Sequence, residues 1–285
     1  MGGAGRFVGY FKWIIMNGVT TDRERLLVIK IGGNVIDDPE MLDSFLKEFA
    51  AIGTKKILVH GGGKVATSLG NKLNIESKYI DGRRITDDET IDLVTMVYGG
   101  LVNKKIVAKL QSFHCNAIGI TGADANLLPA KKREVKEINY GWVGDIEKGK
   151  INRKLWELFL ENGLTPVAAP LTHDNNGHIL NTNADTIAAV IATGLSIIYD
   201  VSLIFCFEKN GVLLDVDNEN SALPKLSFND YDTLKKSKKL FAGILPKIDN
   251  AFDAIKEGVK EVIIGNSSQL TSLINHSGGT KIFSE

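Results

Sequence analysis

Two apolar runs that each end in a glycine turn constrain the fold of this chain more than any other feature. Leu26 to Ile29 leads into Lys30-Ile31-Gly32-Gly33, and Ile57 to Val59 leads into His60-Gly61-Gly62-Gly63. Glycines between a strand and a helix leave backbone N–H groups exposed, and the helix N-terminus adds partial positive charge. We therefore predict that both turns bind phosphate, rather than serving only as tight turns.

A third turn, Asn181-Thr182-Asn183-Ala184-Asp185, places a carboxylate at the start of a predicted helix. Lys30 ends a buried strand, where a lysine either reaches the surface or faces an anion, and the glycines after it favour the anion. A lysine, two phosphate-binding turns and a distant carboxylate together indicate phosphoryl transfer. Taken singly, Asp185, Lys247 and Arg84 are also compatible with ordinary helix-end or surface charges.

Strand-like and helix-like patterns alternate along the chain, which predicts an α/β fold with a mainly parallel sheet. Gly99-Gly100 crosses the longest helix and predicts close packing or a kink there. Asn139-Tyr140-Gly141 predicts the turn of a hairpin within residues 134–150. The strands are expected at 26–31, 56–60, 117–121, 165–169, 196–207, 261–264 and 281–283, and the helices at 38–52, 64–73, 87–112, 152–162, 183–194, 230–239 and 244–258.

The chain divides into three predicted parts. Residues 1–25 form an N-terminal extension, whose glycines at positions 2, 3, 5 and 9 favour a disordered or artificial leader with Met16 as the natural start. A helix that docks on a neighbouring subunit and a signal peptide are the alternatives. The pattern then suggests two lobes, residues 26–194 and 195–285.

Composition excludes several classes of protein. Lys+Arg and Asp+Glu balance at 34 each, which argues against a nucleic-acid partner. No apolar stretch is long enough to span a membrane. Cys115 and Cys206 have no metal-ligand spacing, so we expect two buried thiols, a reducing compartment and no metal site.

The second glycine turn has another interpretation. Gly61 to Ala66 fits the pattern GxGxxA, and Asp81 follows at about the distance of a ribose-binding acid, as in dinucleotide-binding oxidoreductases. This interpretation leaves Lys30 and the Asn181–Asp185 turn unexplained. The pattern GxxxxGK[ST] is absent, which excludes a kinase of the P-loop class. No serine or cysteine nucleophile pattern accompanies His60.

Five segments in this order resemble the amino acid kinase family, most closely its N-acetylglutamate kinase branch. The resemblance covers nearly the whole chain from residue 26. It rests on Val28-Ile29-Lys30-Ile31-Gly32-Gly33, Val59-His60-Gly61-Gly62-Gly63, Asp81-Gly82-Arg83-Arg84-Ile85-Thr86, Asn181-Thr182-Asn183-Ala184-Asp185 and Gly243-Ile244-Leu245-Pro246-Lys247.

The resemblance implies a three-layer sandwich and assigns a role to each motif. Lys30 and Lys247 would hold the phosphoryl group in transit, and Asp185 would orient both ammonium groups. The backbone of Gly33 and Gly62 would cradle the transferred phosphoryl. Expected phosphate-binding residues are Gly32, Gly33 and Gly61, and expected substrate-binding residues are Gly62, Gly63, Arg84 and Asn181.

The implied reaction is ATP-dependent phosphorylation of the γ-carboxylate of N-acetyl- or N-succinylglutamate in arginine biosynthesis. Such an acceptor is ionised at neutral pH, with a pKa of about 4.3, and needs no general base. The resemblance also implies a small-molecule substrate and Mg2+ bound through the ATP phosphates. It further implies a cytoplasmic homodimer. Residues 26–194 would form the lobe that binds the acylated amino acid and dimerises, and residues 195–285 would form the ATP-binding lobe.

One segment leaves the acyl group open. Residues 205–211 depart from the Thr-Asp or Ser-Asp pair of many relatives and look like the variant of bacteria that use N-succinylated intermediates. Aspartate, glutamate, carbamate and nucleoside monophosphates are alternative acceptors within the family. A non-catalytic nucleotide sensor is the alternative outside the enzyme class, although it would not need Lys30, Asp185 and Lys247 together.

Overall fold

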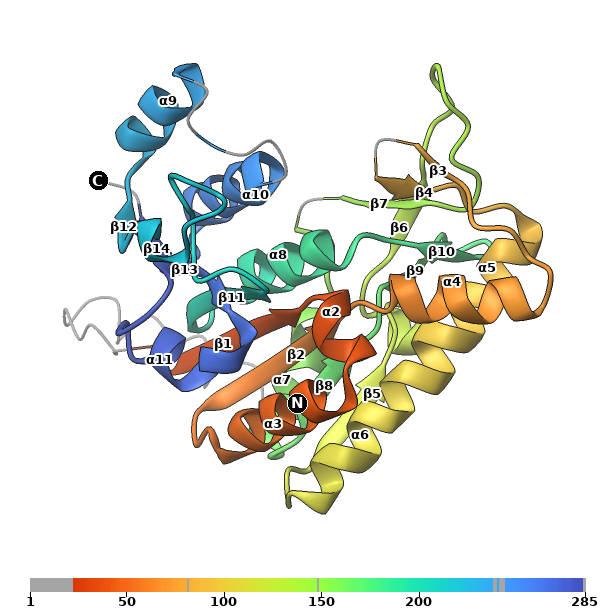
Figure 1. Cartoon of the computed structure of the whole chain (residues 1–285). Helices are drawn as coiled ribbons and strands as arrows, with labels where there is room; N and C mark the ends of the chain where they lie inside the picture. The colour runs from red at the N-terminus through yellow and green to blue at the C-terminus, as the bar shows by residue number, and fades with distance from the viewer. Residues whose placement is uncertain (1–22, 81, 148, 238–239, 241–243, 284–285) are drawn as a thin grey trace, which may run out of the picture.

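The computed structural model describes residues 23–80, 82–147, 149–237, 240 and 244–283. Its centre is an eight-stranded sheet in the order β12-β14-β13-β11-β1-β2-β8-β5 (Figure 1). All neighbouring strands are parallel except β13 and β14, which confirms the predicted α/β class and mainly parallel sheet. The strands are β1 (Arg25–Ile31), β2 (Lys55–His60), β5 (Ala117–Ile120), β8 (Thr165–Ala168), β11 (Asp200–Phe207), β12 (Lys225–Leu226), β13 (Glu261–Asn266) and β14 (Thr280–Ile282).

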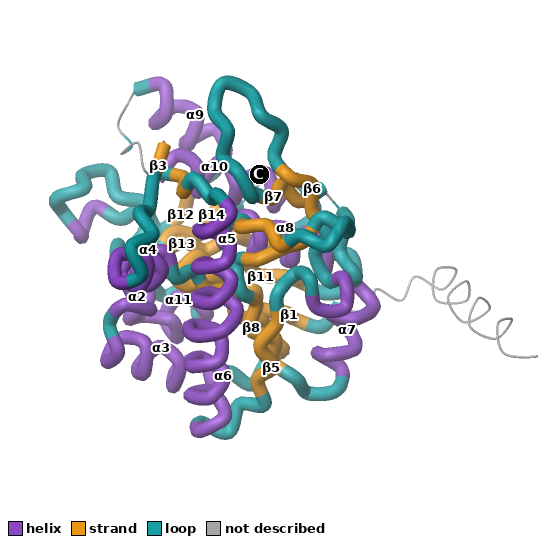
Figure 2. Tube along the Cα trace, turned by 90° about the vertical axis from the view of Figure 1, so that its right-hand side faces the viewer, coloured by secondary structure: helices purple, strands orange, loops and turns teal. Residues whose placement is uncertain are grey.

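Helices cover both faces of the sheet, so the protein has three layers (Figure 2). The α8 face carries α7 (Arg153–Glu161), α8 (Ala184–Leu195) and α10 (Leu245–Lys256). The α6 face carries α3 (Pro39–Ala51), α6 (Asn103–Ser112) and α11 (Leu270–Ile274). Alternate side chains of one strand point to opposite faces. In β1, Leu26 and Val28 therefore pack on the α8 face, whereas Leu27 and Ile29 pack on the α6 face.

The two glycine turns lie at the same edge of the sheet. β1 and β2 are parallel neighbours in which Ile31 pairs with His60, so their carboxyl ends coincide. Each strand leads directly into a helix, α2 (Gly33–Asp37) after β1 and α4 (Gly63–Lys72) after β2. The paired strands thus place both helix N-termini side by side.

The longest predicted helix is continuous but changes its winding around the glycine pair. It consists of α5 (Asp88–Val94), a π-helical segment η1 (Thr95–Val102) and α6. A Cβ atom added to Gly99 would lie 3.3 Å from Leu171 Cδ1. This close approach bears out the predicted tight packing, and the π-helix takes the place of a kink.

The predicted hairpin exists, but its boundaries were wrong. The paired strands are β6 (Ala130–Lys132) and β7 (Gly144–Ile146), so residues 134–138 belong to the connecting loop. The turn residues behave as expected, because Gly141 has a φ of +74° and its N–H donates to Asn139 Oδ1. The strand pairing ends at Lys132 and Gly144, and the side chains of Arg133 and Asp145 form an ion pair beside it.

Several short elements were not predicted, because two or three residues carry no readable periodicity. They include the pairs β3 (Tyr79–Ile80) with β4 (Arg83–Arg84) and β9 (Leu171–His173) with β10 (Ile179–Asn181), and the 3-10 turns η2 (Asp124–Asn126), η3 (Glu219–Ser221) and η5 (Ser267–Gln269). The remaining helix is α9 (Phe228–Lys236).

Cys115 and Cys206 are both free and buried, as predicted. Within the described ranges, no helix is long and apolar enough to cross a membrane. Residues 1–22 of the predicted N-terminal extension lie outside the described residues. The division into two lobes stays a prediction, and strands from both parts share one sheet through the pairing of β1 with β11.

Candidate active site

Asp185 lies between two lysines from distant parts of the chain. It occupies the first turn of α8, where Asn183 Oδ1 accepts hydrogen bonds from the N–H groups of Asp185 and Thr186. Lys30 Nζ lies 2.7 Å from Asp185 Oδ1 and forms an ion pair with it, although the geometry of this contact is not that of a hydrogen bond. Lys247 Nζ donates a hydrogen bond of 2.7 Å to Asp185 Oδ2. The predicted catalytic trio is therefore one contiguous cluster.

The cluster carries a net positive charge at an accessible position. Burial alone would raise the pKa of Asp185, but the adjacent Lys30 and Lys247 ammonium groups lower it to about 2. Asp185 is thus ionised at neutral pH, and two cations oppose one anion. The side chains of Lys30 and Lys247 are 12% and 24% exposed, so neither is fully enclosed by the protein.

The two glycine turns lie against each other beside this cluster. A Cβ atom added to Gly61 would lie 3.9 Å from the backbone nitrogen of Gly33. Gly32 and Gly62 are the N-cap residues of α2 and α4, and neither helix has a side-chain cap. Their first backbone N–H groups therefore have no side-chain acceptor and can bind phosphate oxygens. Gly62 has a φ of +149°, which only glycine adopts readily.

Arg84 is buried beside the second glycine turn. Its guanidinium donates to Gly63 O at 2.8 Å and to Thr67 Oγ1 at 2.9 Å, donates to Ser77, and lies 4.8 Å from the ring centre of Tyr79. It is 6% exposed and forms no ion pair with a described carboxylate. A buried cation held only by neutral groups is suited to an anionic ligand, and the interpretation as a surface arginine is wrong.

Asn181 joins the Arg84 segment through Thr86. Its side-chain amide donates to Thr86 Oγ1 at 3.0 Å, and Thr86 follows Arg84 by two residues. β10 then continues through Thr182 into the N-cap of α8, which links this group to Asp185. Thr86 stands in the segment that carries the resemblance, but no role was assigned to it.

Two parts of the predicted motifs cannot be placed. Gly243 and Asp81 both lie outside the described residues. The partners of Arg84 on α4 and β3, Thr67 and Tyr79, escaped prediction because a single threonine or tyrosine has no pattern that marks it as a partner. Within the described chain, no group of three or more His, Cys, Asp or Glu residues is placed to hold a metal.

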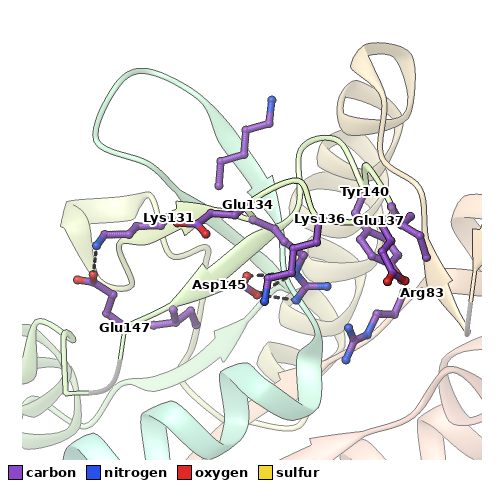
Figure 3. Close-up of a pocket in the computed structure, with 12 residues that line it drawn as sticks. Arg83, Lys131, Glu134, Lys136, Glu137, Tyr140, Asp145 and Glu147 are labelled. Carbon is purple, nitrogen blue, oxygen red and sulfur yellow. Dashed lines mark hydrogen bonds and ion pairs between the residues drawn. The ribbon is translucent and has the colours of Figure 1, made fainter.

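A hollow in the described surface lies elsewhere, over the β6–β7 hairpin (Figure 3). Its volume is about 690 Å³, and most of the residues that line it are charged, of which Lys131 pairs with Glu147 and Arg133 with Asp145. None of the predicted site residues lines it. The candidate active site is at Asp185, because charge, glycine turns and helix N-termini converge there.

Comparisons with known proteins agree with this geometry. The family model described as "Amino acid kinase family" matches residues 25–266. The acetylglutamate kinase of Cytophaga hutchinsonii is 52% identical over 262 residues, which cover 91% of this chain and 98% of the relative. That of Parabacteroides distasonis is 49% identical over 261 residues, covering 91% of this chain and 100% of the relative.

Solved structures share the fold. The crystal structure of smu.665 from Streptococcus mutans UA159 matches with a TM-score of 0.73 at 28% identity, covering 91% of this chain and 99% of that one. Carbamate kinase from Giardia lamblia bound to AMP-PNP matches with a TM-score of 0.67 at 15% identity, covering 93% and 99%. The matched family model, the similar sequences and the shared fold establish that this chain belongs to the amino acid kinase family.

Proposed function

We propose that the protein transfers the γ-phosphoryl group of ATP to the γ-carboxylate of an N-acylated glutamate, as a step of arginine biosynthesis. Relatives about half identical over most of the chain are named acetylglutamate kinase. The observation that carries the proposal is the pairing of Lys30 and Lys247 with one carboxylate, beside two glycine turns. The enzyme class is a phosphotransferase with a carboxyl acceptor.

The chemistry requires alignment and charge neutralisation. An oxygen of the acceptor carboxylate attacks the γ-phosphorus, the bond to the β–γ bridging oxygen breaks, and ADP leaves. The acceptor is already ionised and needs no general base. Lys30 and Lys247 stabilise the negative charge on the phosphoryl oxygens, while Asp185 holds both ammonium groups in place. N–H groups of Gly33 and Gly62 cradle the phosphoryl, and Gly32 and Gly61 complete the two turns.

The acceptor binds through its α-carboxylate. Arg84 supplies a buried guanidinium. Asn181 supplies a side-chain amide, which donates a hydrogen bond to Thr86, two residues after Arg84. Gly62 and Gly63 form the adjoining wall, since Arg84 donates to Gly63 O. Arg84 and Asn181 therefore set acceptor affinity, and the two lysines set turnover.

MgATP binds to the part of the chain from residue 195 onward, and residues 26–194 bind the acylated amino acid and form the dimer. Mg2+ enters as MgATP, held by the phosphates, because both Asp185 oxygens already face ammonium groups. Asn34 of α2 donates to Glu208 Oε2 at 2.5 Å, which ties the first glycine turn to the end of β11. The cellular form is a cytoplasmic homodimer without a nucleic-acid partner.

An acceptor panel tests the proposal and identifies the acyl group. ADP release is measured with MgATP and N-acetylglutamate, N-succinylglutamate, glutamate or aspartate in parallel. We expect turnover with an acylated glutamate and little with the free amino acids. N-Acetylglutamate is the acceptor in the names of the relatives, whereas residues 205–211 favour the N-succinyl compound. A folded, ATP-binding protein that uses none of the four would refute the proposal and favour a nucleotide sensor.

A further inference from the structure

His60 and Asn103 form a buried polar pair directly beneath the second glycine turn. His60 ends β2 and is fully buried, and Asn103 begins α6 and is 1% exposed. His60 Nδ1 lies 2.7 Å from Gly61 O, and His60 Nε2 lies 3.1 Å from Asn103 Nδ2. Asn103 Nδ2 also donates to Val167 O at 2.9 Å. This chain of contacts ends on a peptide of the predicted phosphoryl cradle.

Only one arrangement of protons satisfies these contacts. Two carbonyl oxygens, of Gly61 and Val167, need donors, so His60 carries its proton on Nδ1 and Asn103 directs its amide nitrogen to Val167 O. The second amide proton of Asn103 then donates to the bare His60 Nε2. Asn103 thereby fixes the tautomer in which His60 donates to Gly61 O.

Fixing the Gly61 carbonyl also fixes the direction of the next N–H group. The Gly61–Gly62 peptide is trans and planar, so its N–H points away from its C=O. His60 and Leu58 are two residues apart on β2, so their side chains point to the same face of the sheet. Leu58 packs on the α6 face, and Asn103 lies on that face as well. Gly61 O therefore points to the α6 face, and the Gly62 N–H points away from it.

The predicted phosphoryl site lies on the opposite side. Lys30 follows Leu26 and Val28 at every second position along β1, so its side chain points to the α8 face on which they pack. It forms an ion pair there with Asp185, at the start of α8. We propose that His60 is a positioning residue: it holds the Gly61–Gly62 peptide so that the Gly62 N–H faces the transferred phosphoryl group, and Asn103 holds His60. This inference rests on the proposed function and adds His60 to the residues that position the phosphoryl-binding backbone.

His60 does not act as a base or as a charged group. Burial lowers its pKa to about 4, although its bond to Gly61 O opposes that shift. The imidazole is therefore neutral at the pH of the reaction. Gly62 is the N-cap of α4, so its N–H has no partner within the helix, and the contact of His60 with Gly61 O holds this peptide instead.

Two amide substitutions separate this role from simple packing. In His60→Asn, the amide nitrogen stands where Nδ1 stood and can still donate to Gly61 O. In His60→Gln, the longer side chain places its amide where Nε2 stood, so the donor to Gly61 O is lost. His60→Leu removes both polar atoms. We expect His60→Asn to retain most of kcat, and His60→Gln and His60→Leu to lose about tenfold to a hundredfold, with KM for both substrates little changed.

A binding readout distinguishes a misdirected N–H from a loosened fold. ADP with aluminium fluoride and acceptor imitates the phosphoryl in transit, so its affinity relative to ADP alone reports on the cradle. We expect this preference in wild type and His60→Asn, and its loss in His60→Gln. Equal kcat and equal preference in the Asn and Gln variants would overturn the inference. An inactive wild type would instead refute the proposed function.

Discussion

Asp185 accepts a hydrogen bond from Lys247, 62 residues later in the chain, and meets Lys30 through its other oxygen. The three side chains come from a strand end, a helix start and a second helix start, so no local motif could bring them together. Two cations around one carboxylate leave a positive charge for an anionic group. The account therefore makes the two lysines the main source of charge stabilisation.

Lys30→Ala and Lys247→Ala should each lower kcat by about a hundredfold to a thousandfold, the loss typical of removing one donor to a charged transition state. Steady-state kinetics at saturating substrates measure the effect, and circular dichroism checks the fold. Lys256→Ala is the matched control, because Lys256 is an exposed lysine at the end of the same helix as Lys247. Near wild-type turnover in either site variant would contradict its role.

Asp185 should stabilise the fold in a pH-dependent manner. Because its pKa in the folded protein is lowered from 3.8 to about 2, its contribution is complete above 3.8 and is lost as the pH falls toward 2. At neutral pH, Asp185→Asn should lower the free energy of unfolding by about 3 kcal/mol, because two largely buried lysine side chains lose their carboxylate.

Urea unfolding of wild type and Asp185→Asn across this pH range measures the difference directly. The two proteins should converge in stability as Asp185 becomes protonated. A difference that stays constant down to a pH of about 2 would show that the charge of Asp185 is not what stabilises the cluster.

Gly62→Ala should impair catalysis and folding together. Gly62 has a φ of +149°, and an added Cβ atom would lie 3.0 Å from Tyr98 Cδ1, so the turn must shift. We expect a loss of stability of about 1–3 kcal/mol and a fall in kcat. Gly53→Ala is the control, since its Cβ atom would meet nothing within 4 Å. Thermal unfolding with both variants tests the difference, and equal behaviour would contradict the strained turn.

Arg84→Lys should weaken acceptor binding while leaving ATP binding intact. A lysine cannot keep the bonds to Gly63 O and Thr67 while binding a carboxylate, so KM for the acceptor should rise about tenfold or more. Arg83→Lys is the matched control, because Arg83 is the exposed neighbour on the same strand. A rise in KM for ATP alone would place Arg84 in the nucleotide site instead.

The fold and much of the site geometry were predictable from the sequence, and the physical reasons are specific. β1 contains the apolar run Leu26 to Ile29 and β2 the run Ile57 to Val59, each followed closely by glycine, a pattern typical of buried parallel strands. Their pairing then places both glycine turns at one edge. Lys30 and Asp185 were identifiable because each stands at such a strand or helix end.

The remaining contacts depend on tertiary structure. Thr67 and Ser77 bind Arg84 only because α4 folds back over β4, and neither residue is distinguished by its neighbours in sequence. The hairpin boundaries were misplaced because nothing in the sequence marks residues 134–138 as part of the loop rather than of a paired strand. For His60 the sequence indicates packing beside the glycine turn without a nucleophile pattern, whereas its contact with Asn103 joins residues 43 apart and depends on the fold.

The most direct test of the central claim is to measure ADP and acyl phosphate from the same reaction. Hydroxylamine traps the γ-acyl phosphate of an N-acylated glutamate as a hydroxamate, which is quantified beside ADP. The account predicts equimolar ADP and hydroxamate in wild type and a parallel loss of both in Lys30→Ala and Lys247→Ala. ADP release without hydroxamate would contradict a carboxylate acceptor.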